Sequence, residues 1–287
     1  MEIKRVGVVG CGLMGAGIAE VCARSGYSTV VLEVNQQFLD KGMASLKSSL
    51  EKAFSKGKLS AEDRDATLAR LHGTISMEDF KDCDLVIEAV IENMEEKKRV
   101  FAAADKVCPK HAILASNTSC LSILQMAMAT KRPSQVIGMH FFQPVPVMAM
   151  VEIVKTIVCT ADTVKAAESF GKSLGKKVVF AKDTPGFLVN RLGFPFMMNA
   201  IRMLDEGWTS IEEMDQAWMM ATNSPMGPFT LMDFAGLDTI YSMACAMYDE
   251  FKDPVYAPPP LLKAMVTAGR FGRKNGWGFY DYSKASK

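Results

Sequence analysis

The sequence has only three histidines, almost no net charge and no cysteine pair spaced to hold a metal. Its 33 basic and 32 acidic residues leave a formal charge of +1, so no global field attracts nucleic acid or an anionic membrane. Its seven cysteines are odd in number and contain no Cys-x-x-Cys pair, which favours reduced thiols over disulfides or zinc. We therefore expect a cytoplasmic protein without nucleic-acid partners or a metal.

Long hydrophobic runs are also missing. No uncharged apolar stretch reaches the roughly 20 residues that a membrane-spanning helix needs. The first predicted strand starts at Ile3 with no charged or Arg/Ser-rich leader before it, so no export or organelle signal is expected. With 49% hydrophobic and 23% charged residues among 287, the chain has the composition of a soluble globular protein of one or two domains.

A glycine-rich turn follows the first strand. Gly10-Cys-Gly12-Leu13-Met14-Gly15 leads from a β-branched run into a small apolar helix. The first glycine permits a tight turn, the second lets the backbone approach a pyrophosphate, and the third allows the helix to pack closely on its strand. The helix N-terminus then offers free N–H groups to phosphates. The motif predicts a dinucleotide site.

An acid at the expected distance supports this interpretation. Glu33 ends the second strand, about 20 residues beyond the glycines, where a carboxylate can bind both hydroxyls of a ribose. It would repel a 2′-phosphate, which favours NAD over NADP. A purely structural turn is the alternative, but it explains neither the acid nor the strand and helix on either side.

Strands alternate with helices as far as residue 183. The predicted strands are 3–9, 27–32, 84–90, 112–116, 134–142, 149–154 and 177–181, and the predicted helices are 16–25, 36–58, 60–71, 94–107 and 161–174. We predict a Rossmann-like, mostly parallel sheet domain over residues 1–183.

The pattern changes at Asp183-Thr-Pro-Gly186. Asp183 or Thr184 is expected to cap a helix with Pro185 at its first position, and helical periodicity continues to about residue 250. A last helix is predicted at 261–268, followed by an irregular, glycine-rich surface tail at 271–280. We therefore predict an all-helical domain over residues 184–287.

One stretch, residues 138–153, combines a histidine and a carboxylate in apolar surroundings. His140 ends a predicted strand, and Glu152 lies on the next one beyond a two-proline turn. If the two strands are antiparallel neighbours, the side chains can meet, and the carboxylate would fix the tautomer of a histidine that acts as a base. The alternatives are a core histidine and a strand-end acid. His72 and His111 are expected at the surface.

Polar side chains also follow other strands of the predicted sheet. Glu92 comes after one strand, and Ser119 lies in an Asn-Thr-Ser cluster after another. Open parallel sheets bind ligands beyond the carboxyl ends of their strands, so both side chains should project there together with His140. A simple turn is the alternative for the Asn-Thr-Ser cluster.

Six motifs occur in order: GxGxMGxGIA, EAVIEN, SNTS, GxHFFxPVPxMxxVEI, KDTPGFxVNR and NSPMGP. With them the chain resembles the short-chain (S)-3-hydroxyacyl-CoA dehydrogenases, especially the bacterial 3-hydroxybutyryl-CoA dehydrogenases, from Val6 to Tyr280. The resemblance implies His140 as general base with Glu152 as its partner, and Ser119 and Asn190 near the C3 oxygen of the substrate. It also implies a homodimer formed by the helical domain, active in short-chain fatty acid or butanoate metabolism.

The resemblance further implies which residues hold the ligands. Glu92, Lys97, Ser119 and Lys274 would contact NAD. Ser49 and Lys56, with Ser119, would hold the CoA substrate. One position departs from the family, because Gln143 replaces the usual Asn after His-Phe-Phe on the nicotinamide side. We expect activity to survive this change, with cofactor affinity the quantity affected.

The sequence therefore predicts reversible oxidation of a short (S)-3-hydroxyacyl-CoA to the 3-oxoacyl-CoA by NAD. Acyl length and physiological direction are left open. One alternative is a β-hydroxyacid dehydrogenase that acts on a free acid. Those enzymes commonly use a lysine base, which is missing beside the Asn-Arg of the helical half. Another is a non-catalytic NAD-binding protein, which the intact His140 and Glu152 argue against.

Overall fold

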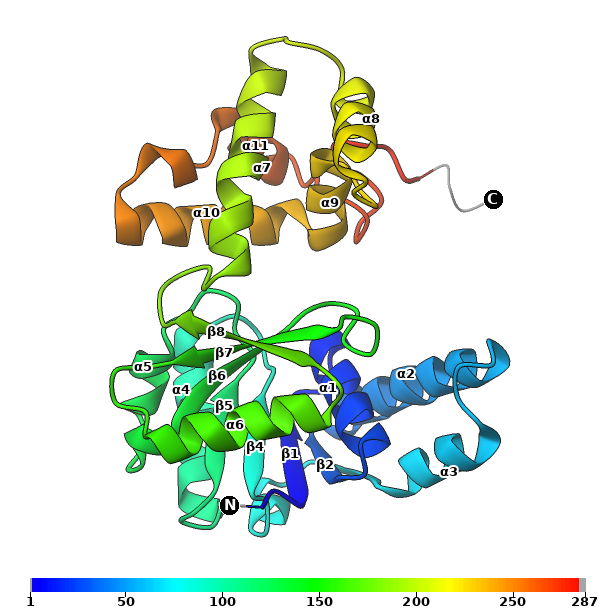
Figure 1. The fold of residues 1–287 in the computed structure, drawn as a ribbon, viewed down its shortest axis with the longest axis vertical. Helices are drawn as coiled ribbons and strands as arrows, with labels where there is room; N and C mark the ends of the chain where they lie inside the picture. The colour runs from blue at the N-terminus through cyan, green and yellow to red at the C-terminus, as the bar shows by residue number, and fades with distance from the viewer. Residues whose placement is uncertain (1, 284–287) are drawn as a thin grey trace. The chain divides into compact units, whose positions relative to one another are not determined.

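The computed structural model describes residues 2–283 and divides the chain into two compact units, Met1–Thr184 and Pro185–Lys287. The first unit is a mostly parallel sheet covered by helices, and the second is helical (Figure 1). This is the predicted fold class.

The sheet of the first unit has eight strands in the order β3-β2-β1-β4-β5-β6-β7-β8. Neighbouring strands are parallel except β6 and β7, which are antiparallel. The chain moves outward from β1 to β3 and then returns to β4 on the other side of β1. The strand order therefore reverses between β1 and β4, and sheets of this kind bind ligands at the carboxyl ends of the strands beside such a switch point. The strands are Arg5–Val9, Ser28–Leu32, Leu71–Thr74, Leu85–Glu88, Ile113–Ser116, Val136–Phe141, Met150–Lys155 and Lys177–Lys182.

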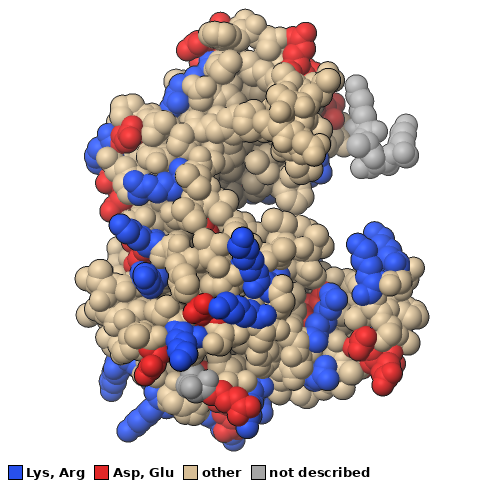
Figure 2. Space-filling model, in the orientation of Figure 1, with Lys and Arg blue, Asp and Glu red and all other residues tan. Residues whose placement is uncertain are grey.

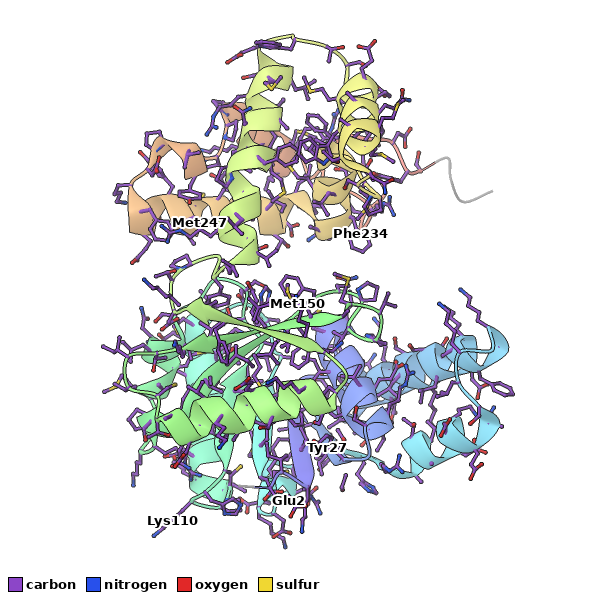
Figure 3. All side chains as sticks on the ribbon, viewed as in Figure 1. Glu2, Tyr27, Lys110, Met150, Phe234 and Met247 are labelled. Atoms are coloured by element: carbon purple, nitrogen blue, oxygen red, sulfur yellow. The ribbon has the colours of Figure 1, made fainter. Side chains whose placement is uncertain are left out.

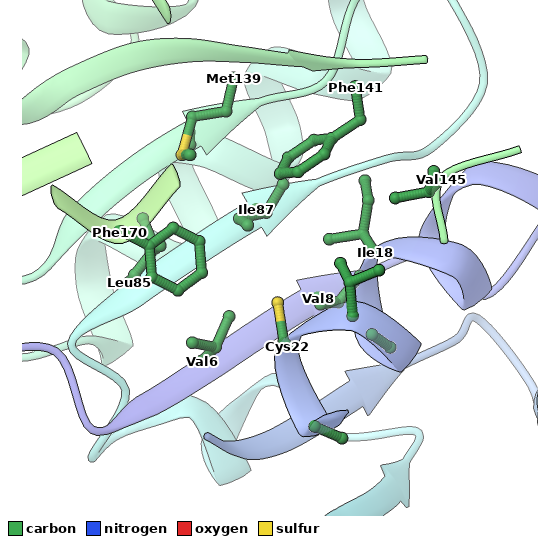
Figure 4. Packing of buried hydrophobic residues seen from close by; sticks show 14 of the residues in the cluster. Val6, Val8, Ile18, Cys22, Leu85, Ile87, Met139, Phe141, Val145 and Phe170 are labelled. Carbon is green, nitrogen blue, oxygen red and sulfur yellow. The ribbon is translucent and has the colours of Figure 1, made fainter. Parts of the chain in front are cut away.

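Alternation along the strands sends side chains to two different layers. On one face, Val8, Ile87 and Phe141 pack with Ile18 of α1 (Leu13–Arg24) and Phe170 of α6 (Ala161–Ser173), as Figure 4 shows. The other face is covered by α4 (Met94–Val107) and α5 (Ile123–Ala127). Side chains fill the space between helices and sheet (Figure 3). The two layers bury the near-continuous apolar runs that are typical of parallel strands.

Two helices predicted at the edge of this unit are present, but the ends predicted for them were wrong and one strand was missed. The helix predicted at 60–71 is α3 (Ala61–Ala69), and Leu71 begins strand β3, which pairs with β2. Only Leu71 and Thr74 of this four-residue strand are sheltered, and Gly73 interrupts it, so it has no period-two pattern. The helix predicted at 36–58 is α2 and ends at Ser55.

The predicted cap at the domain boundary was also wrong. α7 begins at Val189, and neither Asp183 nor Thr184 caps it. Asp183 instead accepts hydrogen bonds from the N–H groups of Ile123 and Leu124 at 2.8 Å each, at the start of α5, a helix that the sequence analysis missed. The carboxylate therefore satisfies a helix N-terminus that is distant in sequence.

The second unit buries an apolar core that includes Phe194, Phe229 and Met247. Its tail is irregular, as predicted, but it is anchored: buried Asp233 accepts hydrogen bonds from the N–H groups of Phe279 and Tyr280, both at 2.9 Å. The helices are α7 (Val189–Asp205), α8 (Ile211–Thr222), α9 (Pro228–Ala235), α10 (Leu237–Phe251) and α11 (Pro260–Thr267).

Candidate active site

The polar residues predicted for the site follow the carboxyl ends of parallel strands in the first unit. The glycine turn from Gly10 follows β1, Glu33 follows β2, Glu92 lies beyond β4, Ser119 lies beyond β5, and His140 is near the end of β6. Because β1, β2, β4, β5 and β6 run in the same direction, these residues share one edge of the sheet.

His140 and Glu152 face one another across the antiparallel pair of β6 and β7. Glu152 Oε2 lies 2.5 Å from His140 Nδ1, and the two residues are 0% and 4% exposed respectively. A carboxylate can only accept, so Nδ1 carries the hydrogen and the neutral ring keeps its lone pair on Nε2. The other two histidines, His72 and His111, are exposed, as expected.

Ser119 stands at the other ring nitrogen of this histidine. Its Oγ lies 3.1 Å from His140 Nε2. The neighbouring Asn117 is buried, and its Oδ1 accepts the N–H of Phe141 at 2.9 Å, which ties the loop after β5 to the end of β6. The cluster therefore does more than form a turn: it fixes a hydroxyl beside the nitrogen that can exchange a proton. A role for Asn117 itself was not predicted from the sequence.

Glu92 holds the same loop from the other side. One oxygen of its carboxylate accepts hydrogen bonds from the Thr118 hydroxyl and, at 3.0 Å, from the Ser119 N–H, while the other lies 3.2 Å from Lys97 Nζ. Burial alone would raise the pKa of Glu92, but the charge of Lys97 and these hydrogen bonds outweigh it and hold the pKa below its usual value. Glu92 is therefore ionised at neutral pH.

The glycine turn has the shape that a pyrophosphate requires. Gly10 has a φ of +95°, and a Cβ on Gly15 would lie 1.9 Å from the Gly10 carbonyl oxygen, so both positions exclude a side chain. A Cβ on Gly12 would meet no protein atom within 4 Å. Gly12 is the N-cap of α1 and provides no side-chain acceptor, so the first N–H groups of the helix remain available to an anion.

Glycine is needed at one further position beside this turn. A Cβ on Gly42 of α2 would lie 2.4 Å from both the carbonyl oxygen and the sulfur of Cys11. Glu33 also reaches the turn, because its Oε1 accepts the Cys11 N–H at 2.6 Å. A hydrogen bond thus joins Glu33, the acid proposed to bind the ribose, to the glycine turn proposed to bind the phosphates. The Glu33 carboxylate keeps lone pairs for further hydrogen bonds.

The remaining predicted site residues come from both units. Leu13 is exposed and Met14 half-buried in the first turn of α1, and Gln143 is exposed in the loop after β6. On α2, Ser49 is half-buried and Lys56 exposed at the C-cap, where basic side chains gather over the tip of the helix (Figure 2). Asn190 and Lys274 belong to the second unit, Asn190 in the first turn of α7 and Lys274 in the tail, paired with Asp238.

Sequence reasoning missed a buried lysine that holds the loop between His140 and Glu152. Lys176 Nζ donates to the carbonyl oxygens of Val145 at 2.8 Å and Met148 at 2.7 Å. Burial lowers the pKa of Lys176. Its sequence context, Gly-Lys-Lys before a strand, looks like an exposed turn and carries no signal of this role.

Residues 2–283 contain neither a candidate metal centre nor a candidate membrane-spanning helix. No group of three or more His, Cys, Asp or Glu side chains is placed to hold a metal ion. None of the helices in this part of the chain combines the length and the apolar character needed to cross a bilayer.

Comparisons with known proteins identify the family of this chain. The model for the NAD-binding domain of 3-hydroxyacyl-CoA dehydrogenase matches residues 5–184, and the model for the C-terminal domain of that enzyme matches residues 186–282. A 3-hydroxybutyryl-CoA dehydrogenase of Mycobacterium tuberculosis is 46% identical over 98% of this chain and 99% of its own length. The mitochondrial hydroxyacyl-coenzyme A dehydrogenase of Homo sapiens is 40% identical over 98% of this chain and 91% of its own.

A solved structure is similar throughout. The crystal structure of (S)-3-hydroxybutyryl-CoA dehydrogenase from Ralstonia eutropha superposes with a TM-score of 0.94 at 42% identity, covering 98% of this chain and 99% of that one. The similarity therefore extends over both units of the fold.

Proposed function

The chain belongs to the 3-hydroxyacyl-CoA dehydrogenase family, an NAD-dependent class of enzymes, and we propose that it interconverts (S)-3-hydroxybutyryl-CoA and acetoacetyl-CoA. The observation that carries the proposal is the arrangement of Ser119, His140 and Glu152 at the sheet edge that also holds the glycine turn. A short acyl chain is supported by the relatives that are named 3-hydroxybutyryl-CoA dehydrogenase.

In the direction of oxidation, His140 Nε2 takes the proton of the substrate hydroxyl. Glu152 accepts a hydrogen bond from Nδ1 and stabilises the positive ring that results. Ser119 Oγ, 3.1 Å from Nε2, orients the same oxygen, and Asn190 is proposed beside it by family resemblance. In the reverse direction the imidazolium returns the proton.

The residues of the glycine turn fit NAD. The first N–H groups of α1, around Leu13 and Met14, would bind the pyrophosphate, and Glu33 would bind the adenosine ribose. Glu92, Lys97 and Gln143 are proposed on the nicotinamide side, with Lys274 from the second unit. When bound, the nicotinamide supplies the hydride acceptor or donor.

The CoA part is proposed to lie against α2. Ser49 and Lys56 occupy that helix, and Lys52 and Lys58 add positive charge near its end, which suits the phosphates of the thioester substrate. A free 3-hydroxy acid could not use these contacts.

A homodimer is proposed through the second unit. Several large apolar side chains are exposed there, among them Leu192 at 73% and Met220 at 85%. Light scattering during size-exclusion chromatography should give the mass of two chains, and the mass of one chain would contradict the dimer.

A cytoplasmic location is also proposed, because the seven free thiols suit the reducing cytosol.

The decisive assay follows absorbance of NADH with four substrate pairs: acetoacetyl-CoA or free acetoacetate, each with NADH or NADPH. We expect acetoacetyl-CoA with NADH to have the highest kcat/KM, by about 100-fold or more over free acetoacetate, because the CoA contacts supply binding energy for catalysis. Equal use of the free acid would support a β-hydroxyacid dehydrogenase. NADH binding without turnover would support the non-catalytic alternative.

A further inference from the structure

A second buried carboxylate, Glu88, lies on the same face of the sheet as the dyad. It ends β4 and is 1% exposed. Its Oε2 accepts the Ser116 hydroxyl at 2.6 Å, and its Oε1 accepts the Val90 N–H at 2.7 Å and lies 2.7 Å from Lys97 Nζ. Both oxygens of the Glu88 carboxylate thus have polar partners in an otherwise apolar layer.

Lys97 is as deeply buried as Glu88. Its side chain is 1% exposed, and its ammonium lies between Glu88 and Glu92 at 2.7 and 3.2 Å. Removing an ammonium from water is costly unless opposite charge compensates for it at close range. Glu88, which is equally buried, supplies that charge, whereas the side chain of Glu92 is 41% exposed at the mouth of the site.

Glu92 then connects the pair to the catalytic loop. One of its oxygens faces Lys97, and the other accepts the Thr118 hydroxyl and the Ser119 N–H. Ser119 Oγ in turn lies 3.1 Å from His140 Nε2. A continuous chain of contacts therefore runs from Glu88 through Lys97, Glu92 and Ser119 to His140.

We propose that Glu88 is a positioning residue that sets the place of Ser119 at His140 through Lys97 and Glu92. With Glu88 ionised, its negative charge compensates the charge of the Lys97 ammonium. One oxygen of Glu92 can then stay near Lys97 while the other accepts hydrogen bonds from the loop that carries Ser119. Without that charge, Glu92 is the only anion near the ammonium and is drawn toward it, which releases the loop. The proposal rests on the proposed function of Ser119 and His140.

Glu88→Gln tests this with little change of shape, because Gln retains the size and an oxygen that can accept the Val90 N–H. It removes the charge, and its NH₂ replaces the second oxygen and can donate to the Ser116 hydroxyl. A purely structural role would lower activity equally in any background, so the test is a double-mutant cycle with Ser119→Ala. We expect Glu88→Gln to lower kcat about tenfold in the wild type and by less than about twofold in Ser119→Ala. Losses that multiply, or no loss in the wild type, would overturn the proposal.

The control is Glu20→Gln. Glu20 is also a buried carboxylate of the first unit, 2% exposed and paired with Arg24, but it lies on α1 and contacts none of these residues. It should leave kcat within about twofold of the wild type. If Glu88→Gln does not fold because Lys97 is left under-compensated, Glu88→Gln is made in a Lys97→Met background, which removes both buried charges. Adding Glu88→Gln to Lys97→Met should then change kcat by less than about twofold, because without the ammonium Glu88 has no route to Ser119, and a larger loss would overturn the proposal.

A readout without turnover separates this proposal from the proposed function. The ring ¹⁵N signals of His140 can be assigned by their loss in His140→Gln. At one fixed pH, Glu88→Gln should move the Nε2 signal in the same direction as Ser119→Ala, and the shift should vanish in the Ser119→Ala background. An unmoved signal overturns the role of Glu88. An inactive wild type would instead count against the proposed reaction, and the signal would still test Glu88.

Discussion

Glu152 lies directly opposite His140 in the only antiparallel strand pair of the sheet in residues 2–283, with 2.5 Å between its Oε2 and His140 Nδ1. The carboxylate has no access to solvent. Water therefore screens the negative charge little, and the charge acts on the ring at short range. This pairing determines which nitrogen of the ring carries the hydrogen, and hence which one can accept a proton from substrate.

Replacement of the histidine should stop chemistry and leave binding intact. We expect His140→Gln to lower kcat by about 100-fold or more, since the amide cannot take up a proton. The glycine turn and Glu33 are untouched, so NADH should bind with an affinity within a few-fold of the wild type, measured by fluorescence titration. Near-normal turnover in this variant would refute His140 as the base.

Glu152→Gln should also slow the reaction, by about 100-fold, because the ring loses its fixed tautomer and the charge that stabilises its protonated form. For oxidation, the acid side of the pH–rate profile should move to lower pH, since a less stable imidazolium forms only at higher proton concentration. An unchanged profile, recorded between pH 5 and 9, would remove Glu152 from the dyad.

Glu33 should decide between the two dinucleotides. Glu33→Gln keeps an acceptor for the Cys11 N–H but removes the charge that repels a 2′-phosphate. We expect the ratio of kcat/KM for NADPH to that for NADH to rise about tenfold. Glu62→Gln, an exposed position of α3, is the matched control and should leave the ratio unchanged. A constant ratio in Glu33→Gln would show that specificity is set elsewhere.

Lys176 should matter for the cofactor, although it is far from the glycine turn in sequence. Lys176→Met removes both hydrogen bonds to the loop that carries Gln143, so we expect KM for NADH to rise several-fold and the melting temperature to fall. Lys177→Met changes the adjacent, exposed lysine and should alter neither quantity. Equal effects of the two variants would contradict the role given to Lys176.

Cys120 should be chemically inert despite lying next to Ser119. Burial, followed by the charge of Glu92, raises the pKa of this thiol to about 12, so its reactive thiolate is scarce at pH 8 and grows about tenfold for each pH unit. Iodoacetamide should leave Cys120 unlabelled in the folded protein at pH 8 and label it in urea, as read by peptide mass mapping. Rapid labelling of the folded protein would indicate an accessible thiolate.

The fold was largely predictable because its strands and helices have strong patterns of their own. The helix predicted at 94–107 has those limits in the structure, and the dyad could be predicted because both of its members lie in one short stretch. Strand β3 was missed because pairing with β2, and not its own sequence, makes it a strand.

The parts of the site that were missed depend on contacts between distant segments. Asp183 was expected to cap the helix that follows it, but tertiary contact assigns it to α5. Lys97 was expected at the cofactor, and its deep burial between two carboxylates could not be inferred from a charged helix. Glu88 did stand out as an acid in an apolar strand, a signal that could have been used.

The close packing of α2 on the glycine turn extends the sequence requirement of this nucleotide site. Any side chain at position 42 would collide with the backbone of Cys11 and displace the turn that approaches the phosphates. A search pattern built only on the familiar glycine triplet therefore omits a position under equal steric constraint. Chains that carry the triplet but a bulky residue at the equivalent of Gly42 must place their second helix differently, and with it any surface that the helix presents to the thioester.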